Sequence, residues 1–121
     1  MYTIFLLSSG AILGALIRWA LSVWLNPIFS QLAFGTLLVN WLGCFLIGIA
    51  IGFNLGEHEK LLLITGFLGS FTTFSSFSAE LSEKLLADKW GEFTMVLSLH
   101  LVGGIVLTIC GILITRWLTS G

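Results

Sequence analysis

The sequence predicts an all-α membrane protein with four transmembrane helices, and three observations support this fold class. Hydrophobic residues make up 57% of the 121 residues and charged residues only 9%, whereas an average soluble domain carries about 25% charge. The few charged residues leave four long uncharged stretches, and a helix needs roughly 20 apolar residues to cross a bilayer. These stretches are continuous rather than alternating, unlike the strands of a membrane β-barrel.

The uncharged stretches predict one four-helix transmembrane domain covering residues 1–121. The Asn26-Pro27 pair separates the first two helices, because proline breaks a helix. We expect the first stretch to be a span and not a secretory signal, since it has no basic segment and stays apolar as far as Arg18 and beyond. The predicted spans are about 4–25, 33–53, 61–79 and 94–116.

Residues 80–92 are polar and amphipathic, and we expect them to continue the third helix into the membrane interface. Glu80 and Lys84 are spaced to form an i, i+4 ion pair on that helix.

The basic residues are almost evenly divided between the two sides of the membrane. With four spans, Lys60 and Arg116 lie on one side and Lys84 and Lys89 on the other, joined there by Arg18 if its side chain extends to that surface. Orientation is normally set by a clear excess of lysine and arginine on the cytoplasmic side. The near balance predicts that the chain inserts both ways up and pairs as an antiparallel, dual-topology homodimer. The alternative is a single orientation fixed by a weak bias or by a partner.

The third span contains the strongest functional signal. Residues 70–78 are all serine, threonine or phenylalanine, and Gly66 and Gly69 precede them. Hydroxyl side chains bend helices and glycine weakens them, so we expect the third helix to be broken at mid-membrane. Main-chain carbonyls freed at such a break hold small hard cations such as sodium. The alternative is a kinked helix packed through hydroxyl–backbone hydrogen bonds.

Phe74 and Phe77 are spaced to share one helix face. Their rings either pack in the core or present their positive edges to an anion. Asn40, in the middle of the second span, is either a hydrogen-bonding link between helices or an amide donor that lines a pore.

The other polar groups within the spans are Arg18 and a stripe on the last span. Arg18 either extends to the membrane surface or lends positive potential to a vestibule. His100, Gly104 and Thr108 follow one helical face, which either lines a narrow path or seats a neighbouring helix. For His100 we favour a structural role over a proton relay.

Three segments resemble the motifs of one known family, the CrcB/Fluc fluoride channels. They are residues 14–19 (GALIRW), residues 35–40 (GTLLVN) followed by Gly43, and residues 66–80 (GFLGSFTTFSSFSAE). The resemblance extends over nearly the whole chain, and the third motif is the most specific.

The resemblance implies an antiparallel, dual-topology homodimer in the bacterial plasma (inner) membrane that passively exports fluoride from the cytoplasm and so lowers its toxicity. It implies a structural sodium ion held by the backbone carbonyls of Gly69 and Thr72 from both subunits. It also implies a fluoride pathway along Arg18, Asn40, Phe74, Ser75, Ser76, Phe77 and Thr108.

Other function classes fit the sequence less well. A small multidrug-resistance-type, proton-coupled cation exporter needs a glutamate embedded in its first span, whereas the first acidic residue here is Glu57. A helper subunit of a larger membrane complex remains a second alternative. We do not expect an enzyme, because no nucleophile–base set or metal-ligand cluster is present. A net charge of −1 offers no basic patch for nucleic acid.

Overall fold

The computed structural model describes residues 1–120, and within them it is helical with no β-strand. Four helical segments are long and apolar enough to cross a membrane, which confirms the predicted helical fold class. The third segment extends beyond its predicted span because residues there, such as Glu83 and Lys84, themselves favour helix. The four segments are Tyr2–Ile28, Phe34–Gly52, Glu57–Leu86 and Trp90–Ser120.

The first two segments are joined at the turn that the sequence indicates. α1 (Tyr2–Leu25) is followed by the short 3-10 helix η1 (Asn26–Ile28), which contains the proline. α2 (Phe34–Gly52) begins after an irregular stretch. Asn26 Oδ1 accepts the N–H of Thr36 at 3.0 Å, which satisfies a first-turn N–H that has no acceptor inside the helix.

The third segment contains two residues with extended backbone between helical pieces. Thr72 has φ −82° and ψ 158°, and Thr73 has φ −147° and ψ 110°, values that belong to extended structure and not to a helix. We call this pair the Thr72–Thr73 link. The helical pieces are, in order, α3 (Glu57–Glu59), the π-helix η2 (Lys60–Leu68), α4 (Gly69–Phe71) and, after the link, α5 (Phe74–Leu86).

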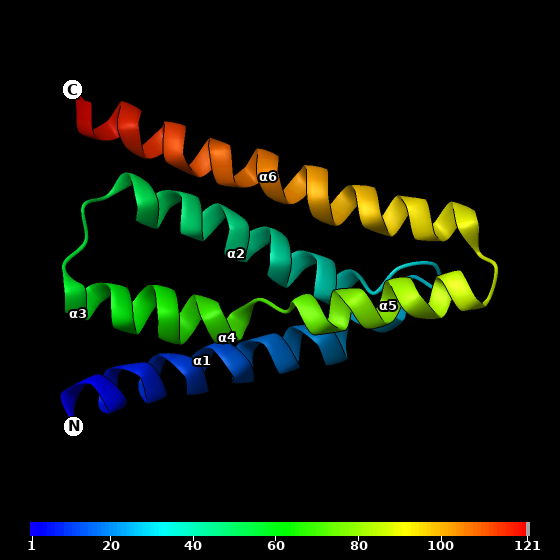
Figure 1. Cartoon of the computed structure of the whole chain (residues 1–121), viewed down its shortest axis with the longest axis horizontal. Helices are drawn as coiled ribbons and strands as arrows, with labels where there is room; N and C mark the ends of the chain where they lie inside the picture. Colours follow the sequence, from blue (N-terminus) through cyan, green and yellow to red (C-terminus); the bar gives the residue numbers. More distant parts are fainter. Residues whose placement is uncertain (121) are drawn as a thin grey trace.

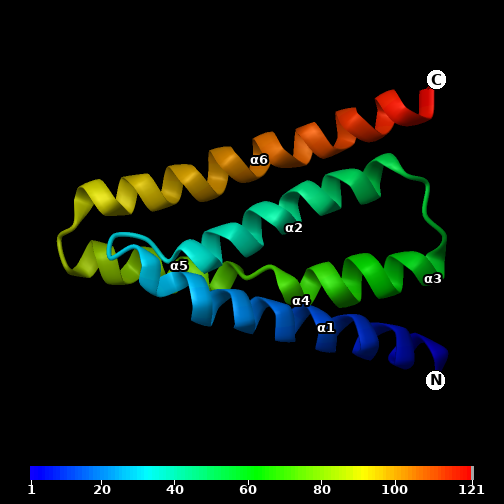
Figure 2. The same ribbon diagram turned by 180° about the vertical axis from the view of Figure 1, so that it is seen from behind.

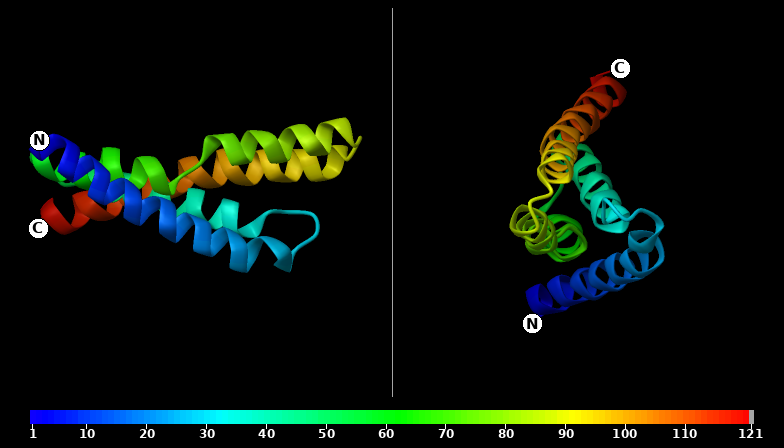
Figure 3. Two further views of the ribbon diagram at one scale, coloured as in Figure 1. Left: turned by 90° about the horizontal axis from the view of Figure 1, so that it is seen from below. Right: turned by 90° about the vertical axis from the view of Figure 1, so that its right-hand side faces the viewer.

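The segments pack mainly as two pairs of helices, which also contact each other through α1 and α2. The two ends of the chain and the α2–α3 connection lie together at one end of the molecule (Figure 1), and the view from behind shows the other two connections at the opposite end (Figure 2). α2 packs mainly against α6 (Trp90–Ser120), and α1 mainly against η2. Beyond the link, α5 separates from α1 and runs beside α6 (Figure 3).

The buried apolar core lies next to the link. Val39, Leu68 and Phe71 form a buried cluster against which Leu21, Ile47 and Phe67 pack. Most of the remaining large apolar side chains are exposed along the four segments. This distribution is expected when the outer surface faces lipid, because lipid chains solvate apolar side chains.

α5 ends in a tight turn that brings α6 back against it. The Lys89 N–H donates to the Lys84 carbonyl at 2.9 Å, and the Asp88 N–H donates to the Leu85 carbonyl at 3.1 Å. This pair of hydrogen bonds is the Schellman motif, and the φ of 58° at Asp88 is its left-handed position.

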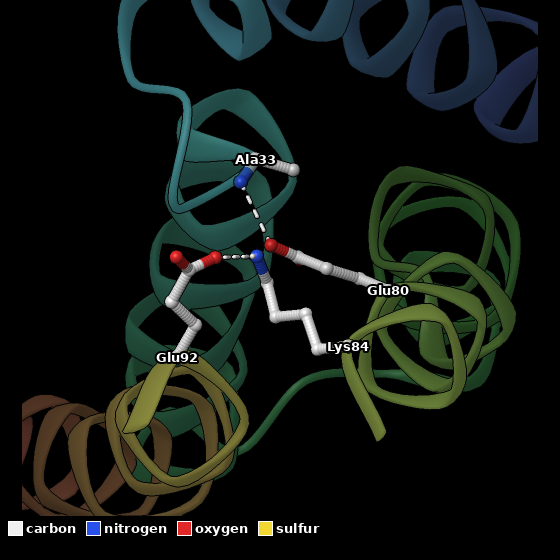
Figure 4. Close-up of polar contacts among 4 residues, drawn as sticks. All are labelled: Ala33, Glu80, Lys84 and Glu92. Atoms are coloured by element: carbon white, nitrogen blue, oxygen red, sulfur yellow. Dashed lines mark hydrogen bonds and ion pairs between the residues drawn. The ribbon is translucent and has the colours of Figure 1, made fainter. Parts of the chain in front are cut away.

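Polar contacts between helices fix the end of the molecule near this turn (Figure 4). Glu80 Oε2 accepts the N–H of Ala33, just before α2, at 2.8 Å. Lys84 Nζ binds Glu92 Oε1, on α6, at 2.9 Å. The expected Glu80–Lys84 pair is therefore wrong. A carboxylate is stabilised by the unpaired N–H groups at a helix N-terminus, and the Schellman turn brings Glu92 within reach of Lys84.

Small residues allow α2 and α6 to approach closely. A Cβ added at Gly48 would overlap the carbonyl oxygen of Thr108 and lie 3.1 Å from the Cα of Gly111. Across the same contact, Thr108 Oγ1 donates to the carbonyl of Cys44 at 3.0 Å. Glycine is enriched at such contacts between membrane helices because it lets their backbones come together.

We expect Gly48→Ala to destabilise the protein by about 1–3 kcal/mol, since its methyl group has to displace the backbone of α6. Thermal unfolding in detergent, followed by size-exclusion chromatography, measures the effect. Gly91→Ala is the matched control, because a Cβ at Gly91 has nothing within 4 Å. Equal melting temperatures for the two variants would contradict the close approach.

Candidate functional site

An open cavity of about 420 Å³ lies beside the Thr72–Thr73 link. Of the predicted site residues, Asn40, Gly69, Thr72, Phe74 and Phe77 line it, whereas Arg18, Ser75, Ser76 and Thr108 are not among its lining residues. Thr73 and His100 also line it. The remaining lining residues are Gly43, Cys44, Ile47, Ile64, Leu68 and Leu101.

The side chain of Asn40 binds both main-chain polar groups of Thr73. Its Oδ1 accepts the Thr73 N–H at 2.8 Å, and its Nδ2 donates to the Thr73 carbonyl at 3.0 Å. An extended residue directs its N–H and C=O to the same side, as in a β-ladder, whereas a helical residue directs them along opposite senses of the helix axis. The extended angles of Thr73 are therefore what allow one carboxamide to satisfy both groups.

Thr73 also begins α5 as its N-cap. Its Oγ1 accepts the N–H of Ser76 at 3.1 Å, the arrangement typical of a threonine N-cap. The hydroxyls of Ser75 and Ser76 lie 3.3 Å and 3.1 Å from Thr73 Oγ1. In this structure the two exposed serines therefore support the start of α5.

Because of these contacts, two N–H groups do not donate to the carbonyls of Gly69 and Thr72, as they would in a continuous helix. Such a helix would pair the Thr73 N–H with the Gly69 carbonyl and the Ser76 N–H with the Thr72 carbonyl. Here the first N–H donates to Asn40 Oδ1 and the second to Thr73 Oγ1.

The two carbonyls are suited to a hard cation, because oxygen atoms at helix breaks coordinate sodium. Gly69 and Thr72 both line the cavity. Within residues 1–120 no group of three His, Cys, Asp or Glu side chains is arranged to hold a metal ion.

Arg18 binds the main chain just before the link. It is partly buried, and its Nε donates to the Ser70 carbonyl at 2.9 Å. In a continuous helix that carbonyl would accept the N–H of Phe74, the first residue of α5. The positive charge of Arg18 therefore supports the carboxyl end of α4.

The two phenylalanines occupy different environments. Phe77 is buried and stacks on the His100 ring, with centroids 4.3 Å apart and an interplanar angle of 27°. Phe74 is 76% exposed and meets Phe77 edge-on at 5.7 Å. Phe77 thus belongs to the wall of the cavity, whereas most of the Phe74 ring lies on the outer surface of the chain.

On the last span, His100 belongs to the cavity and Thr108 to helix packing. Thr108 Oγ1 lies 3.0 Å from the carbonyls of Cys44 and Gly104, at the contact between α2 and α6. His100 Nδ1 lies 3.2 Å from Asn40 Nδ2.

Sequence reasoning gave Thr73 no role of its own and gave His100 a structural role without naming its partner. A threonine directly before a helix is an N-cap signal, but it becomes visible only once the start of α5 is known. Nothing in the spacing of Asn40 and His100, which are 60 residues apart, indicates that they meet.

We expect Thr73→Val to destabilise the protein by about 1 kcal/mol, the usual effect of losing an N-cap hydroxyl. The midpoint of thermal unfolding in detergent measures it. The matched control is Thr94→Val, whose hydroxyl bonds only to the Trp90 carbonyl on its own exposed helix surface. If Thr73→Val unfolds no earlier than the control, the N-cap is not contributing.

Comparison with known proteins places the chain in a family. The model of a family described as "CrcB-like protein, Camphor Resistance (CrcB)" matches residues 5–112. A protein of Haemophilus ducreyi named fluoride-specific ion channel FluC is 57% identical over 121 residues, which cover 100% of this chain and 98% of the relative.

Two further relatives have the same name. The protein of Mannheimia succiniciproducens is 48% identical over 96% of this chain and 95% of its own length. The protein of Pasteurella multocida is 46% identical over 94% of this chain and 93% of its own length. Because the family model and these full-length relatives agree, the chain, a multi-pass membrane protein, belongs to the CrcB-like family.

Proposed function

We propose that the protein is a fluoride-selective ion channel that passively exports fluoride from the cytoplasm across the bacterial inner membrane and so lowers its toxicity. The observation that carries this proposal is the 57% identity, along the entire chain, to a protein named fluoride-specific ion channel FluC. The expected alternative, a proton-coupled cation exporter, is not supported, because the acidic residue that it needs in α1 is absent from the sequence.

The chemistry of the cavity is compatible with an anion. Its lining residues include no acidic side chain, so no fixed negative charge repels fluoride there. The edge of the Phe77 ring supplies weak positive potential. The N-terminus of α5, which begins at Phe74 beside the cavity, adds to it. Weak, distributed stabilisation suits conduction, because an ion held too tightly does not leave.

The remaining predicted pathway residues take supporting positions in this proposal. Arg18 adds a positive charge close to the link through its bond to the Ser70 carbonyl. The exposed hydroxyls of Ser75 and Ser76 are donors that a partly dehydrated fluoride ion requires. Thr108 steadies α6 against α2 beside the pathway.

We further propose that the Thr72–Thr73 link lies at mid-membrane and binds a structural sodium ion. The redirected donors described above support this, since they leave the carbonyls of Gly69 and Thr72 without their helical partners. The ion supplies positive charge that holds these oxygens together. The same two carbonyls from a second copy complete the ligand set.

The assembly we propose is an antiparallel, dual-topology homodimer. It is supported by the near balance of basic residues between the two sides of the membrane and by the open cavity in a single copy. The ring of Phe74, 76% exposed, is then covered by the second copy rather than by lipid.

Fluoride efflux from proteoliposomes, monitored with a fluoride electrode and with chloride as the comparison ion, tests the channel directly. We expect Asn40→Asp to slow efflux by roughly a thousandfold when ionised. A new negative charge at about 4 Å from the anion repels it by about 4 kcal/mol at an effective dielectric constant near 20. The carboxylate also lacks the N–H that donates to the Thr73 carbonyl.

Asn54→Asp is the control for this experiment, because it adds the same charge at an exposed loop position. Wild-type liposomes that release no fluoride would refute the channel. Normal efflux through a correctly folded Asn40→Asp would remove Asn40 from the pathway.

Removal of sodium tests the cation site. We expect protein purified with N-methylglucamine in place of sodium to lose about tenfold or more of its fluoride flux, corresponding to about 1.4 kcal/mol, and to regain it when sodium is added. The dimeric fraction in detergent should fall and recover in parallel. Full flux and an unchanged dimer in the absence of sodium would contradict the site.

A further inference from the structure

The orientation of the Asn40 carboxamide is fixed by the main chain of Thr73. The Thr73 N–H can only donate, so the Asn40 atom that faces it at 2.8 Å is the oxygen Oδ1. The Thr73 carbonyl can only accept, so the atom that faces it at 3.0 Å is Nδ2. Rotating the carboxamide by half a turn would oppose donor to donor and acceptor to acceptor, and both hydrogen bonds would be lost.

This orientation in turn determines the state of His100. Nδ2 carries two hydrogens, and the second faces His100 Nδ1 at 3.2 Å. An amide nitrogen donates and does not accept, so Nδ1 must be the lone-pair nitrogen of a neutral imidazole. The proton therefore resides on Nε2, which is buried and has no hydrogen-bond partner among the described residues.

The ring of His100 is also fixed in place, by burial and by stacking. The residue is only 8% exposed, and its ring stacks on Phe77 at 4.3 Å. The chain of contacts runs from the Thr73 main chain through Asn40 to His100 and then to Phe77, and so joins α2, α5, α6 and the link.

We propose that His100 is a positioning residue, held as the neutral Nε2–H tautomer, whose Nδ1 accepts the second amide hydrogen of Asn40 and keeps that carboxamide turned toward the Thr73 main chain. The inference rests on the proposed channel for its effect on flux. The tautomer itself rests only on the hydrogen-bond geometry.

Three substitutions separate the acceptor from the ring. In His100→Asn, Oδ1 is attached to Cγ as Nδ1 is, so the acceptor is kept while the ring is lost. His100→Gln is the matched control, since it has the same amide with its oxygen one bond further out. His100→Phe keeps the ring that stacks on Phe77 and removes the acceptor.

We expect His100→Asn to retain most of the fluoride efflux. We expect His100→Gln and His100→Phe to conduct about tenfold less or worse, the order of effect for a buried amide N–H left unpaired. Efflux that is normal in His100→Phe, or as low in His100→Asn as in the other two, would overturn the proposal.

A second measurement needs neither transport nor a variant at position 100. The chain has two histidines, and the other, His58, is exposed. In His58→Gln labelled with ¹⁵N-histidine, all imidazole signals therefore come from His100. We expect a protonated Nε2 and an unprotonated, hydrogen-bonded Nδ1 near neutral pH, and a mixture of tautomers when Asn40→Leu is added.

An Nδ1–H tautomer, or a charged imidazolium, in the His58→Gln protein would overturn the proposal even if every variant at position 100 failed to fold. The two measurements also distinguish failure of this inference from failure of the proposed function. Wild-type protein that conducts no fluoride refutes the channel, while the tautomer assignment is judged by NMR alone.

Discussion

The pairing of the Asn40 carboxamide with the main chain of Thr73 is the interaction on which the rest of the site depends. Main-chain polar groups taken out of a helix have to find other partners in a low-dielectric environment, because the unpaired group is costly. Asn40 satisfies two of them with one side chain. The extended link then allows α5 to leave α1 and run beside α6, and this change of partner helix shapes the cavity.

Interrupting a helix creates two electrically opposite surfaces at one place. The carboxyl end of α4 presents carbonyl oxygens, and Arg18 donates a hydrogen bond to one of them, that of Ser70. The amino end of α5 presents N–H groups, of which the Ser76 N–H is capped by Thr73. A cation is stabilised at the first surface and an anion near the second. The proposals for sodium and fluoride thus draw on a single feature of the backbone rather than on two separately evolved sites.

Composition and the positions of the charged residues were sufficient to predict four membrane-spanning helices, because the bilayer imposes both length and apolarity on each span. The contacts of the site were less accessible. Glu80 and Lys84 have the spacing of a local ion pair, yet Glu80 binds the N–H of Ala33 just before α2, and Lys84 binds Glu92 on α6. Arg18 and Thr108 were recognised as polar groups within spans, but their bonds to the Ser70 and Cys44 carbonyls depend on how the helices pack. Local spacing carries no information about such tertiary partners.

Because Asn40 recognises the backbone of residue 73 and not its side chain, the two positions should tolerate change very differently during divergence. The side chain at position 73 caps the start of α5, a role that serine, aspartate or asparagine also fulfils. Position 40 has no equivalent substitute, since aspartate lacks the donor, glutamine is too long and serine too short for the same two-point contact. We therefore expect position 73 to vary among related proteins while position 40 remains asparagine.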